Sequence, residues 1–66
     1  MSTAEIVARC QQVAAMERDM ADVRRTLTLA EVDLIFAVRG FPERTEEAKA
    51  RLKAAAEILN KWSQPQ

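Results

Sequence analysis

The chain has 66 residues, ten of them basic and ten acidic, and a formal net charge of zero. A domain of this length buries only about 60% of the surface that its unfolded chain exposes, so its core is marginal. Small domains usually gain stability from disulfides, a structural metal or a partner subunit. With one cysteine, Cys10, and no histidine, an internal disulfide and the usual four-ligand zinc site are both excluded. We therefore predict no metal and no cofactor, and expect a protein partner as the stabiliser.

The charges are spread along the chain, and the longest basic run is Arg24-Arg25. Proteins that bind nucleic acid or membrane surfaces usually carry a basic patch, so neither class of partner is expected. No apolar segment approaches the roughly 20 residues of a membrane span. The first residues lack the basic start and apolar core of a secretory signal. The sequence predicts a cytoplasmic protein.

The first predicted helix begins at about residue 3, because Ser2 to Glu5 match the capping-box pattern. Apolar residues then recur at seven-residue intervals, at Ile6, Val13, Met20, Leu27 and Leu34. The last four of these are each followed, three positions later, by a further apolar residue: Met16, Val23, Ala30 and Ala37. This heptad pattern predicts a long helix with a packed seam.

A turn is predicted around Gly40, which fits the left-handed position just past a helix end. Phe41 is expected to lie over Phe36, and Pro42 to take the first position of the next helix. The first helix should therefore cover about residues 3–39.

The second helix is predicted over about residues 43–62. Its apolar stripe is expected to contain Ala48, Leu52, Ala55, Leu59 and Trp62, with Ile58 beside it. Glu47–Arg51 and Glu57–Lys61 are expected as exposed pairs along the helix. The fold class is all-α: an antiparallel helical hairpin, with residues 1–66 as a single domain and residues 63–66 as a flexible tail.

One alternative is a break in the first helix, because Thr28 to Glu31 form a second capping pattern, and Thr26 and Thr28 are weak helix formers. A break would produce three helices. We favour a continuous helix, because the heptad phase runs through this region without a skip.

The two helix lengths predict surfaces that the chain cannot cover itself. The first helix should be about 55 Å long and the second about 30 Å, which leaves the first half of the longer helix without a neighbour. In its second half, Leu27, Ala30, Leu34 and Ala37 can face the second helix. A helix that is apolar on all sides is normally buried on all sides. We therefore predict two partner-binding surfaces: an outer face of Leu29, Val32, Ile35 and Phe36, and an N-terminal strip of Ile6, Val13, Met16 and Met20.

Other interpretations of single residues stay open. Met16 and Met20 suit an adaptable partner surface, although methionine at this spacing is more often plain core. Trp62 is expected to close the open end of the hairpin in preference to anchoring a partner. Cys10 could link a parallel dimer, although a semi-buried, unreactive thiol is commoner. Without histidine, tyrosine or a glycine-rich phosphate loop, we predict that the protein is not an enzyme.

Residues of the hairpin resemble a known family. Arg39-Gly40, Pro42-Glu43, Leu52 and Ile58-Leu59 resemble the second half of the small E-type co-chaperones of bacterial type III secretion, over about residues 36–62. In that family a helical hairpin docks on a TPR-like chaperone, and the two together hold the needle subunit in the cytoplasm. The resemblance implies a co-chaperone or adaptor with a helical-repeat partner.

The alternative function is a self-associating hairpin, in which two copies form a four-helix bundle. Such a dimer could act as a regulator that binds RNA across a face with Arg18, Arg24, Arg25 and Arg39. RNA binding would depend steeply on salt, whereas docking through an apolar face would not. An accessory structural protein is a third possibility.

Overall fold

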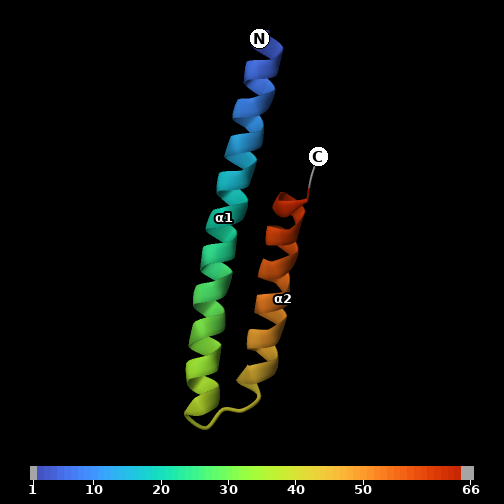
Figure 1. The fold of residues 1–66 in the computed structure, drawn as a ribbon. Coiled ribbons are helices and arrows are strands. Elements are labelled where there is room, and N and C mark those ends of the chain that lie inside the picture. The colour runs from blue at the N-terminus through green and yellow to red at the C-terminus, as the bar shows by residue number, and fades with distance from the viewer. Residues whose placement is uncertain (1, 65–66) are drawn as a thin grey trace.

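The computed structural model describes residues 2–64 and consists of two antiparallel helices joined by a short loop (Figure 1). Helix α1 covers Thr3–Val38 and helix α2 covers Arg44–Ser63. Residues 2–64 contain no strand. The predicted all-α hairpin, with a long first helix and a shorter second one, is therefore confirmed. Of the predicted tail, Ser63 belongs to α2, and residues 65–66 lie outside the described part of the chain.

Helix α1 begins where the capping pattern predicts and has no break. The Ser2 hydroxyl accepts a hydrogen bond from the Glu5 backbone N–H at 3.2 Å, which satisfies one of the free donors at the helix start. At the suspected break, the Thr28 hydroxyl donates to the Arg24 carbonyl at 2.9 Å inside the continuous helix. The second capping pattern is therefore not used as a helix start.

The loop confirms the predicted cap at Gly40, whose φ is 114°. The Phe41 N–H donates to the Phe36 carbonyl at 3.1 Å, as in a Schellman motif. The two phenyl rings pack edge to face, with their centres 5.8 Å apart. The prediction for Pro42 is wrong, because α2 begins two residues later at Arg44. The Pro42 carbonyl instead accepts from the Thr45 N–H at 3.1 Å, so Pro42 belongs to the turn.

Replacing Gly40 with alanine should lower the free energy of unfolding by about 1–2 kcal/mol, because a Cβ atom strains a residue with positive φ. No heavy atom lies within 4 Å of the position that this Cβ would take, so the loss reflects backbone strain and not a clash. Urea denaturation followed by circular dichroism measures it. Unchanged stability would show that the loop does not depend on this conformation.

The helices pack through small side chains. Ala30, Ala48 and Ala55 are each 1% exposed and Val23 is 5% exposed. The separation of packed helices depends on the side chains at the contact, and alanines allow a close approach. The predicted seam is therefore partly wrong: Ala37 is half-buried, but four leucines expected at the contact are 41–45% exposed, namely Leu27, Leu34, Leu52 and Leu59.

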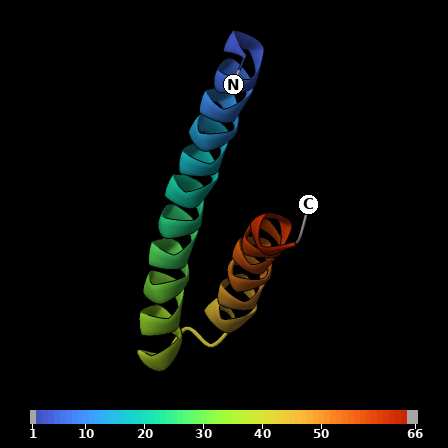
Figure 2. The same cartoon turned by 45° about the horizontal axis from the view of Figure 1, so that its top comes forward.

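Helix α1 extends well past the end of α2 (Figures 1 and 2). Lys61 and Trp62, near the end of α2, both contact Asp19 on α1. Residues 3–18 of α1 therefore form an overhang, about 24 Å long, and the described chain measures 58 Å along its longest axis.

Candidate interaction surfaces

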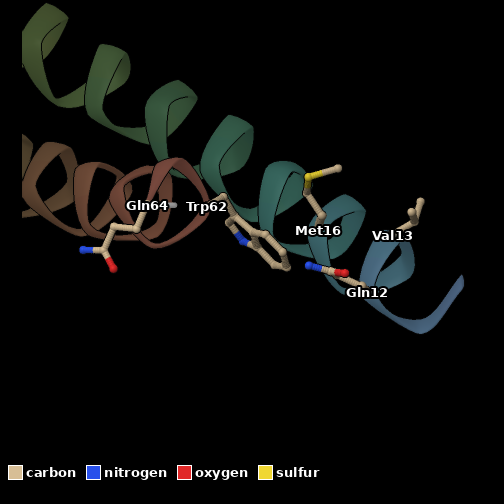
Figure 3. A pocket seen from close by; sticks show the side chains of 5 residues that line it. All are labelled: Gln12, Val13, Met16, Trp62 and Gln64. Atoms are coloured by element: carbon tan, nitrogen blue, oxygen red, sulfur yellow. The ribbon is translucent and has the colours of Figure 1, made fainter. Parts of the chain in front are cut away.

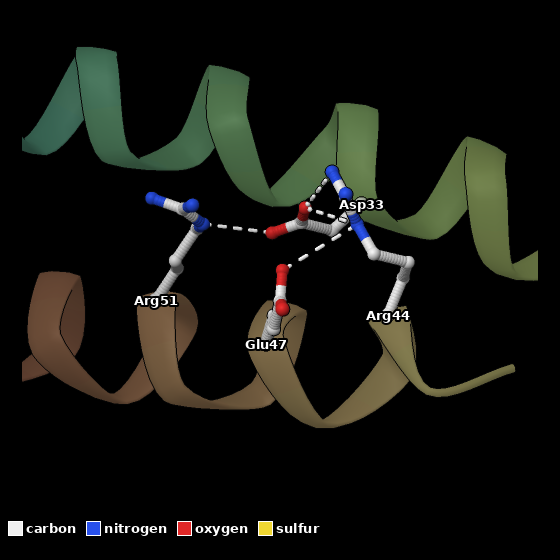
Figure 4. Close-up of polar contacts among 4 residues, drawn as sticks. All are labelled: Asp33, Arg44, Glu47 and Arg51. Carbon is white, nitrogen blue, oxygen red and sulfur yellow. Dashed lines mark hydrogen bonds and ion pairs between the residues drawn. The ribbon is translucent and has the colours of Figure 1, made fainter. Parts of the chain in front are cut away.

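A buried ion-pair cluster holds the loop half of the hairpin together (Figure 4). The Asp33 carboxylate on α1 is 1% exposed. One of its oxygens accepts from Arg44 Nη2 at 2.8 Å and the other accepts from Arg51 Nε at 2.7 Å. Glu47 approaches Arg44 Nε at 3.4 Å. Two arginines of α2 are thereby fixed to one carboxylate of α1.

This cluster explains why the helix contact differs from the predicted seam. A buried carboxylate is tolerated only when it is paired and hydrogen-bonded, so the arginines and Asp33 must all face the contact. Asp33 follows Ala30 by three residues, which turns the contact toward Asp33 and away from Leu27 and Leu34. The prediction that Arg51 pairs with Glu47 along the helix is wrong for the same reason.

The charge on Asp33 is maintained by its partners. Burial alone raises the pKa of the Asp33 carboxyl. Hydrogen bonds from Arg51 and Arg44 and the charges of both lower this pKa by more than burial raises it, so the net pKa lies below its ordinary value. The pKa of Asp19 is also lowered, chiefly by hydrogen bonds from Trp62 and Lys61. Both carboxylates therefore remain ionised at neutral pH.

The hairpin should lose stability in acid, because both carboxyl groups have lower pKa values in the folded chain than in the unfolded one. Their contribution is complete above the ordinary pKa of about 3.9 and disappears as the pH falls through the lower folded values. Thermal unfolding measured from pH 7 to about pH 2.5 should show a midpoint that falls below about pH 4. Asp33→Asn should flatten this fall, and a parallel curve for the variant would contradict the assignment.

Trp62 closes the open end of the hairpin, as predicted. Its indole Nε1 donates to the Asp19 carboxylate at 2.7 Å. Lys61 Nζ reaches the same oxygen at 3.1 Å and lies 5.1 Å from the centre of the indole ring. One prediction is wrong here: Lys61 pairs with Asp19 on α1 and not with Glu57 on its own helix.

An open hollow of about 240 Å³ lies where α2 ends against α1. Figure 3 shows the Trp62 ring directed toward the overhang at this step. Its lining combines the end of α2 with the overhang of α1: Gln12, Val13, Met16, Trp62 and Gln64. The N-terminal strip therefore adjoins the closed end of the hairpin.

Most of the N-terminal strip is exposed. Ile6, Val13 and Met16 lie on the overhang with 40–49% of their surface accessible, and Met20, just beyond it, is half-buried. Cys10, predicted to be semi-buried, is exposed and forms no disulfide. The structure thus places the four strip residues on one helix and leaves Ile6, at the far end of the overhang, 49% exposed.

The four exposed leucines share one flank of the hairpin. Leu27 and Leu34 lie three residues before and four residues after Ala30, and Leu52 and Leu59 hold the same positions relative to Ala55. Positions three before and four after a residue lie on the same side of it around the helix axis. On two antiparallel helices that face each other through Ala30 and Ala55, these positions lie on the same side of the hairpin. We call these residues the leucine flank. Sequence reasoning missed this surface because it placed the leucines inside the helix contact.

The outer face is exposed but divides into two parts. Leu29, Val32 and Phe36 follow helical spacing and form one stripe, hereafter the outer stripe, with 39–42% exposure. The Arg44 guanidinium lies 5.0 Å from the centre of the Phe36 ring. Ile35 lies elsewhere, in a shallow hollow of about 390 Å³ with Glu31, Leu34, Val38 and Arg39.

Within residues 2–64 no group of three or more potential ligands is placed to hold a metal ion. Neither helix is long and apolar enough to cross a membrane. Comparisons with models of protein families, with curated proteins and with solved structures find no match. Function is therefore inferred from the surfaces of the hairpin itself.

Proposed function

We propose that this protein is a non-catalytic, cytoplasmic interaction module, a co-chaperone or adaptor that binds a helical partner through the outer stripe. One observation supports the proposal most. Among residues 2–64 the buried apolar core is Val23, Ala30, Ala48 and Ala55, whereas fourteen large hydrophobic side chains are at least 39% exposed. Exposed apolar side chains that gather into a stripe, as those of Leu29, Val32 and Phe36 do, mark interaction sites.

The outer stripe suits recognition of a helix face by a groove. Its residues recur at three- and four-residue spacing, the pattern by which a helix presents anchors to an apolar groove. Phe36 is held in place by the Phe41 ring and by Arg44, which reduces the entropy lost on binding. The resemblance of residues 36–62 to the E-type co-chaperones makes a TPR-like chaperone of a secretion needle subunit the partner to test.

The test is calorimetric titration of the chain into such a purified chaperone. Replacing Leu29 and Val32 together with glutamate should weaken binding at least about 100-fold, because two apolar anchors are lost, while the helical content stays unchanged. Ala50→Glu, an exposed position on α2, is the control and should bind as the wild type does.

Two outcomes would count against the proposal. The double variant could bind as tightly as the wild type, or the wild type could fail to bind the chaperone. Binding of RNA with an affinity that falls steeply with salt would favour the regulator instead.

A further inference from the structure

We propose that the N-terminal strip and the leucine flank are covered by a second copy of this chain. In the proposed dimer the α1 helices run antiparallel, and the overhang of each copy lies along the leucine flank of the other. This inference goes beyond the proposed function, because it concerns other residues and leaves the outer stripe accessible to a different partner.

The lengths of the two parts of α1 fit this arrangement. Residues 3–18 form the overhang, and residues 19–38 are paired with α2, which corresponds to about 24 Å and 30 Å. Each overhang is therefore long enough to cover most of the leucine flank of a second hairpin. An antiparallel pair centred near Met20 gives both overhangs a neighbour over their whole length.

The apolar residues along α1 match in the same arrangement. The row at seven-residue intervals runs from Ile6 to Leu34 and has Met20 at its middle. In an antiparallel pair centred there, Ile6 lies level with Leu34 of the second copy, and Val13 lies level with Leu27. The exposed leucines of α2, Leu52 and Leu59, lie beside this contact on the same flank. The N-terminal strip of each copy thereby meets the leucine flank of the other.

The charges beside this row decide the direction of pairing. Glu17 and Arg24 follow Val13 and Met20 by four residues each, are exposed, and form no ion pair within residues 2–64. In the antiparallel pair Glu17 lies opposite Arg24 of the second copy, and the dimer contains this contact twice. A parallel pair instead places Glu17 level with Glu17, about 10 Å along the axis from Arg24. Charge complementarity therefore favours the antiparallel dimer.

Sedimentation equilibrium of the full chain tests the dimer, with circular dichroism as the check on folding. The wild type should have twice the chain mass of 7.4 kDa. Glu17→Arg and Arg24→Glu should each weaken the dimer about tenfold, because like charges then face each other twice. The two changes together should restore the dissociation constant to near the wild-type value. The two positions are about 10 Å apart on one helix, so this rescue cannot arise within a single chain.

A cross-linking experiment tests the direction of pairing. In the antiparallel dimer the two Cys10 thiols are about 30 Å apart, so a short bismaleimide should not link wild-type chains. In Glu31→Cys, position 31 lies opposite Cys10 of the second copy, and a covalent dimer should form. Glu31→Cys combined with Cys10→Ser is the control and should not be linked.

Three results would overturn the proposal. The wild type could be a folded monomer at every concentration. The dimer of the variant with both charges exchanged could be no tighter than the dimers of the single variants. Finally, Cys10 of one wild-type chain could cross-link to Cys10 of another. The last result identifies a parallel dimer. Binding of a chaperone through the outer stripe is measured on other residues, so the two proposals can fail independently.

Discussion

Replacing Ala55 with leucine is expected to destabilise the hairpin by about 1–3 kcal/mol, because the larger side chain has to enter a close helix contact. Ala55 is 1% exposed and faces α1. Urea denaturation at one fixed chain concentration measures the loss, since association makes stability depend on concentration. Circular dichroism should show that the variant remains helical.

The neighbouring Ala54 provides the matched control, because it is exposed on the same helix. Ala54→Leu adds the same atoms outside the contact and should change stability by no more than about 0.5 kcal/mol. Equal effects at positions 54 and 55 would contradict the close approach of the two helices.

Replacing Asp33 with alanine is expected to cause the largest loss of stability of any substitution of a charged residue in this chain. The change removes the buried carboxylate that joins both Arg44 and Arg51, whose side chains are 35% and 38% exposed, to α1. Two charge-assisted hydrogen bonds across the helix contact are lost together, which costs more than the loss of one pair on the open surface. The urea midpoint of the variant measures this effect.

Glu46→Ala is the control for Asp33→Ala. Glu46 pairs with Lys49 at 3.3 Å on the exposed surface of α2, and such pairs contribute little to stability. If the two variants were equally stable, the buried cluster would not hold the helices together, and the position of the helix contact would need another cause.

The ends of the helices could be predicted because their causes are local. Ser2 caps α1 through a residue three positions away, and Gly40 with Phe41 ends it through contacts within five residues. The continuous course of α1 through Thr28 likewise follows from a heptad pattern that never changes phase. Only Pro42 was misplaced, by two residues, because a proline can serve a turn as well as a helix start.

The side on which the helices meet could not be predicted, because it depends on contacts between distant residues. Asp33 lies 11 and 18 residues before its two arginine partners, and an arginine at position 51 has an equally plausible glutamate on its own helix. The heptad alone places the leucines inside. Burying Asp33 moves them to one flank, so the leucine flank emerges only from the structure.

The exposure of the residues proposed to bind a partner was predicted better than their grouping into surfaces. The outer stripe is exposed, and the overhang carries three of the four strip residues. Ile35, however, is separated from the outer stripe and lies in a different hollow with Leu34 and Val38. Spacing along a helix predicts which residues are exposed, but the position of α2 determines which of them share a surface.

The most direct test of the requirement for a partner is the solution mass of the purified chain, measured by light scattering over a range of concentrations, with circular dichroism on the same samples. We predict a helical species of twice the chain mass of 7.4 kDa, which dissociates on dilution with loss of helix. A fully helical, stable monomer at every concentration would contradict the conclusion that the exposed apolar surfaces of this hairpin require cover by a second protein molecule.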